Sequence, residues 1–375
     1  MISFSNELTY KYLPILAISP AEMGALGQLP EKDKDLILPL FPIKGWMSAK
    51  KLDNALDKIN ESIGNRIWIA DIDADFLYSN KSFKMEGAYS REVFEEIHKL
   101  LDSSDGYKNW FNFLQTRDNI IPTLQLEHIT DINIQLDLLS SLERGIVIRF
   151  QMTKIEPKKF NSIIRSLLNH NYDNYLFILD YADIGRVEVV NCSQYSELIN
   201  KMKELFPNSM FSISSTSFPF SFAGAYRGEI PIYERQIYRN IKRDCNDINL
   251  IYSDRGSARA GKYNGGGGTP PPRIDYPLKN DWRFIRKEFD GKNITKLEKE
   301  KLYFEAAREI IKSDYWIKDL GLWGTQMIEK TALEDTYGIT CPNRSTAVRI
   351  NIHLYQQLHY NDIISELNTD EEWED

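Results

Sequence analysis

The sequence has few cysteines, and they form no recognisable motif. Cys192, Cys245 and Cys341 are the three cysteines among 375 residues, and none stands in a CxxC pair. Small secreted domains held by disulfides need several cysteines at short spacings, which this chain lacks. We therefore expect reduced thiols.

Long apolar runs are missing as well. No stretch approaches the roughly 18 consecutive apolar residues that a membrane helix needs. Residues 1–19 do not combine a basic segment with a long apolar one, as a signal peptide would. We therefore expect a cytoplasmic protein that does not contact membranes.

An excess of basic residues is also absent. The chain has 46 Lys and Arg against 54 Asp and Glu, a formal net charge of −8. A negative protein repels nucleic-acid phosphates, so we do not expect nucleic acid as a partner. Aromatic residues make up 12% of the chain, which instead favours a packed core and protein interfaces.

The phosphate-binding glycine motifs are not found. The segment after the first apolar run, AISPAEMGAL (17–26), lacks GxGxxG, and Gly265 to Gly268 are not followed by the Lys-Ser/Thr of a P-loop. The glycines and the prolines after them predict a flexible hinge and a stiff arm. We interpret residues 261–278 as a Gly/Pro-rich loop at the rim of the fold.

The sequence does contain a regular alternation of apolar runs with helical patterns. The runs are β-branched or aromatic and too uniformly apolar for a sheet with one wet face, which is typical of buried parallel strands. Helical spacing of apolar residues separates most of them. The predicted strands are residues 12–19, 36–44, 66–74, 120–127, 145–151, 175–182, 209–217 and 249–254.

This alternation predicts a single (β/α)8 domain similar to a TIM barrel, with additional C-terminal helices and loops. An open, doubly wound sheet is the alternative, which the missing glycine-rich turn disfavours. Residues 1–260 would form the barrel strands and helices, and 261–278 the rim loop. Residues 279–368 would form closing helices and a C-terminal arm of the same domain, and 369–375 an acidic tail.

The expected arm contains the segment RSTAVRINIHLYQQLHY (344–360). Arg349, Asn351 and His353 alternate there, so they would share one face of an extended chain. We therefore expect a short extra strand or an extended segment at this position.

Polar residues stand at the ends of the predicted strands, where barrel enzymes carry their active sites. The candidates for catalysis are Asp71, Asp73, Glu127, Arg149, Asp180 and Asp254. Alternation along IWIADID places Asp71 and Asp73 on the same face. We expect no resident organic cofactor, but Asp71, Asp73, Glu127 and Asp180 have the oxygen ligands that Mg2+ or Mn2+ takes. The alternative is a buried ion pair of Arg149 with Asp71 or Asp180.

A second group of residues could bind a ligand or a partner. Basic side chains surround the glycine run and the expected mouth of the barrel, where they would attract a phosphate or an acidic surface. The candidates are Lys44, Arg255, Arg259, Lys262 and His353.

The order of several short motifs resembles the Beta proteins of satellite phages and prophages. YLPIL, EMGAL and PLFPI come first; IVIRF, LFILD and STSFP follow; YSD and NIH stand near the end. The resemblance runs from about Tyr10 to Tyr360. Pro42 stands where the family often has an acidic residue, and Ser253 where it often has glycine.

The resemblance implies a TIM-barrel-like fold and no established reaction. It also implies a role in loci where Beta counteracts the toxic Gop protein and contributes to antiphage defence in a bacterial host. By position, Arg149, Asp180, Asp254 and His353 match polar residues of the family. The partner would then be a protein, a toxin or a phage component. The alternative from the residues alone is a metal-dependent barrel hydrolase resembling a phosphodiesterase.

Overall fold

The computed structural model describes residues 4, 9–245, 247–261, 269–291, 294–318 and 320–363. Lys262, the four glycines 265–268 and the acidic tail 369–375 lie outside these residues, so the predictions about them stay predictions. Among the described residues, no helix is both long and apolar enough to cross a membrane.

Each of the eight predicted apolar runs contains a parallel strand. The strands are β1 (Tyr12–Pro14), β2 (Leu40–Ile43), β3 (Trp68–Ile72), β4 (Ile120–Pro122), β5 (Ile146–Gln151), β6 (Tyr175–Asp183), β7 (Met210–Thr216) and β9 (Leu250–Asp254). The prediction of a mixed α/β chain built on parallel strands is therefore confirmed.

These strands form two sheets instead of one closed barrel. The larger sheet has the order β1-β9-β7-β6-β5, and the smaller one has the order β2-β3-β4. In the part of the chain that the structure describes, isolated bridges such as Ile15 with Leu40 and Thr123 with Val147 join the two sheets, together with single backbone hydrogen bonds. Strands β1 and β4 at these seams are three residues long and end at Pro14 and Pro122. Proline has no N–H to donate, so each seam lacks one backbone hydrogen bond at its proline, and bonding across the seam resumes two residues later at Leu16 and Leu124.

Both parallel sheets pack on one common apolar cluster. Every parallel strand contributes to it, including Leu13 of β1, Leu40 of β2, Val147 of β5, Ile178 of β6 and Ile251 of β9. We call this side of the strands the inner face. The alternate residues lie on the outer face, where they join the larger cluster with the helices.

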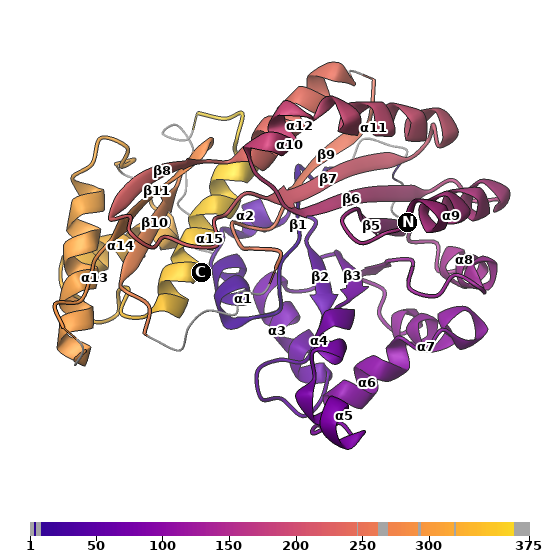
Figure 1. Cartoon of the computed structure of the whole chain (residues 1–375), viewed down its shortest axis with the longest axis horizontal. Helices are drawn as coiled ribbons and strands as arrows, with labels where there is room; N and C mark the ends of the chain where they lie inside the picture. The colour runs from indigo at the N-terminus through magenta and orange to yellow at the C-terminus, as the bar shows by residue number, and fades with distance from the viewer. Residues whose placement is uncertain are drawn as a thin grey trace, which may run out of the picture.

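Helices follow most of the strands and cover the outer face (Figure 1). They are α1 (Pro20–Gly27), α2 (Glu31–Lys34), α3 (Asp53–Ile63), α4 (Ala74–Tyr78), α5 (Lys81–Glu86), α6 (Glu92–Leu100), α7 (Ser104–Gln115), α8 (Ile132–Ser140), α9 (Pro157–Asn169), α10 (Arg186–Val190), α11 (Ser193–Leu205) and α12 (Tyr233–Asp244). Helix α9 illustrates the local rule, because Pro157 at its first turn fixes the backbone and Ile163, Ile164 and Leu167 form its buried stripe.

The C-terminal third differs from the prediction of closing helices and an extended arm. Its strands β10 (Arg273–Pro277) and β11 (Asp281–Arg286) form an antiparallel sheet of order β10-β11-β8 with β8 (Arg227–Pro231), which precedes β9 in the chain. Strand β10 occupies the last part of the predicted rim loop. The helices α13 (Lys296–Ile311), α14 (Trp323–Ala332) and α15 (Pro342–Leu358) complete this part.

Helix α15 replaces the strand or extended segment expected at residues 344–360. Pro342 stands at its first turn, and residues 347–358 are buried on all sides, including Arg349, Asn351 and His353. It contacts α1, α14, β1 and β10, so it joins the antiparallel sheet to the parallel strands. Figure 1 shows it as the yellow helix between them. A helix that is buried on all sides has no polar face. Its sequence therefore lacks the alternation of apolar and polar residues by which an amphipathic helix is predicted.

Candidate functional site

Arg149 binds two carboxylates from different parallel sheets. It lies two residues after Val147 on β5 and therefore on the inner face. Its Nη1 lies 2.8 Å from Asp71 Oδ2 of β3. Its Nε and Nη2 lie 3.0 Å and 2.6 Å from Asp180 Oδ2 of β6. The guanidinium thus connects the ends of β3, β5 and β6.

Arg255, directly after β9, adds a second cation to this group. Its Nη2 lies 2.6 Å from Asp180 Oδ2. Burial alone would raise the pKa of Asp180, but the charges of Arg255 and Arg149 and their hydrogen bonds hold it well below its ordinary value. Burial alone would lower the pKa of Arg149, yet Asp180 and Asp71 raise it. Asp180 and Arg149 therefore stay ionised opposite each other.

The remaining carboxylate oxygens of the group are also hydrogen-bonded. Asp71 Oδ1 accepts from Thr123 Oγ1 at 3.0 Å, from Gln125 Nε2 at 3.3 Å and from the amide of Ile72 at 2.8 Å. Asp180 Oδ1 accepts from the amide of Ala182 at 3.0 Å. All four carboxylate oxygens of Asp71 and Asp180 are thus paired, which is what keeps carboxylates stable in a protein interior.

The other predicted catalytic carboxylates do not join this group. Strand β3 ends at Ile72, and Asp73 caps α4 by accepting from the amide of Phe76 at 3.1 Å. The prediction that Asp71 and Asp73 share a face is therefore wrong, because the chain leaves the strand between them. Glu127 is exposed and accepts from the Tyr78 hydroxyl at 2.5 Å.

Three of the predicted partner-binding residues contact other parts of the chain: Arg255, Arg259 and, as described below, His353. Arg255 binds Asp180 as described, and Arg259 Nε donates to the Pro219 carbonyl at 2.8 Å. Lys44 is half-buried just after β2.

Asp254 belongs to a separate group on the outer face. It shares that face with Tyr252, whereas Ile251 belongs to the inner cluster. Its carboxylate accepts from the Tyr12 hydroxyl, from the Tyr252 hydroxyl at 2.7 Å and from the amide of Gly256 at 2.8 Å. His353 Nε2 of α15 lies 2.8 Å from its Oδ2. The single site expected from the sequence is thus divided between the two faces of the sheet.

The surroundings of this second group shift the pKa values of two carboxyls in opposite directions. Burial alone would raise the pKa of Asp254, but His353, Tyr12 and the amide of Gly256 lower it below its ordinary value. Glu234 of α12 has its pKa raised to about 8 by burial and by the negative charge of Asp254. Its Oε2 accepts from Ser217 Oγ at 2.5 Å, which lowers the pKa only in part. Glu234 is therefore largely protonated at neutral pH.

Sequence reasoning missed Glu234 and its neighbour Arg235. The Arg235 guanidinium lies 3.3 Å from the centroid of the Tyr252 ring, a cation–π contact. It missed a third buried group too, in which Asp275 of β10 binds Arg273 at 2.8 Å and Arg349 of α15 at 2.9 Å. The local sequence around these charged residues does not indicate that they are buried. Their burial results from the packing of α15.

The described residues include no group of three His, Cys, Asp or Glu side chains placed to hold a metal ion. Asp71 and Asp180 contact the same guanidinium, and Asp73 and Glu127 make the separate contacts given above. The four predicted ligands therefore do not converge.

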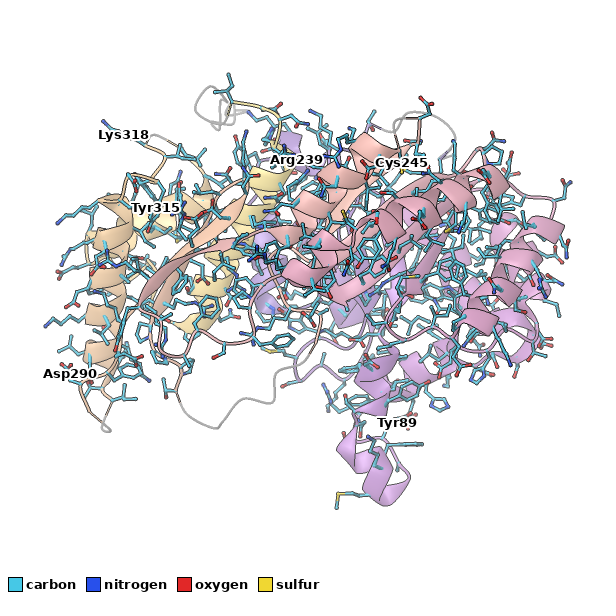
Figure 2. The ribbon with its side chains drawn as sticks, turned by 45° about the horizontal axis from the view of Figure 1, so that its top comes forward. Tyr89, Arg239, Cys245, Asp290, Tyr315 and Lys318 are labelled. Carbon is cyan, nitrogen blue, oxygen red and sulfur yellow. The ribbon has the colours of Figure 1, made fainter. Side chains whose placement is uncertain are left out.

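Exposed apolar side chains gather in the segment that projects from the body near α4, α5 and α6. Tyr78, Phe83 and Met85 are between 40% and 84% exposed. Phe83 stacks on Tyr89 with centroids 4.4 Å apart, and this segment extends away from the sheets at Tyr89 (Figure 2). Apolar and aromatic groups exposed together are typical of a surface that contacts another protein.

Comparisons with known proteins agree with the resemblance found in the motifs. The family model described as Beta protein matches residues 12–359. Protein beta of Enterobacteria phage P4 is 30% identical over 365 residues, covering 95% of each chain. The chain therefore belongs to the Beta protein family.

Proposed function

We propose that this protein acts by binding a protein partner in antiphage defence, most simply by neutralising a toxin. The observation that carries the proposal is the contact of Arg149 with both Asp71 and Asp180. The carboxylates at the strand ends are committed to an internal ion-pair group, so they serve the fold and leave recognition to other surfaces.

The chemistry of that group also disfavours acid–base catalysis there. A general acid or base works best when its pKa lies near the working pH. Arg255 and Arg149 hold the pKa of Asp180 far below that range, and the carboxylate is 1% exposed. A carboxylate in this state neither takes up a proton at neutral pH nor meets a substrate.

The projecting segment supports the binding role. Its rings continue from Phe83 and Tyr89 to Phe94, which stacks on Phe76 with centroids 4.7 Å apart. The exposed end is thereby anchored in the buried part of the fold. A rigid aromatic surface loses little conformational entropy on binding, which favours affinity.

The same proposal includes the finer architecture and the place of action. The isolated bridges at both seams and the common apolar cluster support a (β/α)8-type barrel that is interrupted between β1 and β2 and between β4 and β5. The phage relative and the family's loci support action in the cytoplasm of a bacterial host.

The test is to express the chain together with the Gop-type protein encoded in its own locus. We expect the chain to restore host growth and to form a complex that elutes as one species in size-exclusion chromatography. The Asp71→Asn/Asp180→Asn variant, if folded, should restore growth equally, because catalysis at the strand ends is not involved. A locus without such a toxin, or a chain that neither binds it nor restores growth, would overturn the proposal.

A further inference from the structure

The groove between α3 and the loop after β2 has the chemistry of a receptor for a cationic side chain. We propose that it binds a lysine or arginine of the protein partner. The inference rests on the proposed function only in taking the partner to be a protein; the groove itself is argued from its own residues.

The groove combines an aromatic wall with an acidic wall. It has a volume of about 380 Å³ and is lined on one side by Trp46, Met47 and Ala49 and on the other by Asp57 and Glu61. Met47 is 65% exposed, and Trp46 is half-buried against the core. An aromatic face beside carboxylates is the arrangement that attracts a cation, through the ring quadrupole and through charge.

The chain's own Lys58 already marks the position that a cation takes. Its Nζ lies 5.9 Å from the centroid of a Trp46 ring. The same ammonium lies 2.8 Å and 2.5 Å from the two carboxylate oxygens of Glu61. Lys58 is one turn away from Glu61 on the exposed side of α3, so it can swing out when a partner's cation enters.

The aromatic wall is held in place by contacts with α6. The amide of Ala49 donates to the carbonyl of Trp46 at 3.1 Å, which closes a turn with Ser48 at a φ of 59°. Arg91 Nη1 donates to the Ala49 carbonyl at 2.7 Å. A non-glycine residue at positive φ is uncommon and costs energy. The turn is therefore fixed by its surroundings and presents Trp46 in one position.

Charge favours a basic occupant over an acidic or neutral one. The lining of the groove has a net charge of −1, because it contains the carboxylates of Asp57 and Glu61 and the ammonium of Lys58. The whole chain carries −8, which raises the encounter rate with a basic partner. Arg91 connects the groove to the projecting segment, so a partner can place its cation in the groove while its apolar groups contact Tyr78, Phe83 and Met85.

The test uses the full chain and a fluorescein-labelled peptide of alternating lysine and leucine, followed by fluorescence anisotropy at low salt. We expect Trp46→Leu to weaken binding about three- to fivefold and Trp46→Phe to restore most of it, because Phe keeps a ring face. Asp57→Asn with Glu61→Gln should weaken binding about tenfold. Lys58→Met should strengthen it, because the internal competitor is gone.

A second groove at the far end of the molecule provides the matched control. It is lined by carboxylates and lysines beside α13 but contains no tryptophan among its lining residues. Asp290→Asn with Glu305→Gln makes the same charge change there, and Figure 2 shows Asp290 at the left end of the molecule, apart from Tyr89 on the segment at the bottom. This variant should bind the peptide within about twofold of the wild type.

The outcomes separate the inference from the proposed function. Equal losses of peptide affinity in the Asp57/Glu61 variant and the control variant would overturn the inference that the groove binds a cation. No binding by the wild type at millimolar peptide would overturn it too. A groove that binds the peptide in a chain that forms no toxin complex would overturn the proposed function alone. A toxin complex unaffected by Trp46→Leu and by the Asp57/Glu61 variant would overturn the groove as the partner site.

Discussion

His353 and Asp254 are 99 positions apart, yet the imidazole Nε2 lies 2.8 Å from the carboxylate Oδ2 and neither side chain is exposed. This contact fixes α15 to the end of β9, beside Tyr12 of β1. The carboxyl end of the parallel sheet is therefore closed by the C-terminal part of the chain. The two residues hold these two parts of the fold together.

Replacing His353 with Leu should destabilise the fold by about 2–3 kcal/mol, because Asp254 stays buried and loses one of its donors. The free energy of unfolding from urea titration measures the loss. His128→Leu is the control, since that side chain is exposed and should change stability by no more than about 0.5 kcal/mol. Equal effects of the two changes would show that the His353–Asp254 contact does not hold α15.

Replacing Arg149 with Leu should cost about 3–5 kcal/mol, because Asp71 and Asp180 then face each other with one cation fewer. Chemical denaturation gives the value. The exposed pair of Lys154 with Asp75 is the comparison, and Lys154→Leu should cost less than about 1 kcal/mol. A loss below about 1 kcal/mol for Arg149→Leu would mean that the ion-pair group contributes little.

The eight strands could be predicted because parallel strands are buried on both faces and appear as uninterrupted apolar runs. Whether these strands close into one barrel could not be predicted. Whether neighbouring strands continue their ladder depends on single positions such as Pro14 and Pro122, and on how far each strand extends. The apolar pattern of the sequence indicates neither the effect of such positions nor the length of each strand.

The site was predicted in part for a similar reason. Alternation says which residues share a face but not which face it is. It placed Arg149 correctly relative to Asp71 and Asp180, while Asp254 lies on the outer face with Tyr252. Glu234 resembles an ordinary charged residue in the first turn of a helix, and only tertiary packing makes it 3% exposed.

Adding Mg2+ or Mn2+ at millimolar concentration should leave the melting temperature unchanged to within about 1 °C. A metal that binds only the folded chain would raise it, by RT ln(1 + [L]/Kd) in free energy. Asp71 and Asp180 would first have to release Arg149 and Arg255. A rise of several degrees that disappears in Asp71→Asn/Asp180→Asn would favour the metal-dependent hydrolase instead.

Glu234 should make the stability of the fold depend on pH in an unusual direction. Its folded pKa is raised to about 8, whereas the unfolded carboxyl has the ordinary value of 4.5. Between these values the folded state binds the proton and the unfolded state does not, so the free energy of unfolding falls as the pH rises. The contribution is fully present below about pH 4.5 and is lost as the pH passes through about 8.

Glu234→Gln removes this dependence, because glutamine is neutral at every pH and keeps an oxygen that accepts from Ser217. Urea titrations at pH 6 and pH 8.5 should show the wild type losing about 2–3 kcal/mol more than the variant over this interval. Glu197→Gln at an exposed position of α11 is a matched control and should follow the wild type. If stability depends on pH in the same way for the wild type and Glu234→Gln, then Glu234 is ionised in the folded protein. Its burial beside Asp254 would then not raise its pKa.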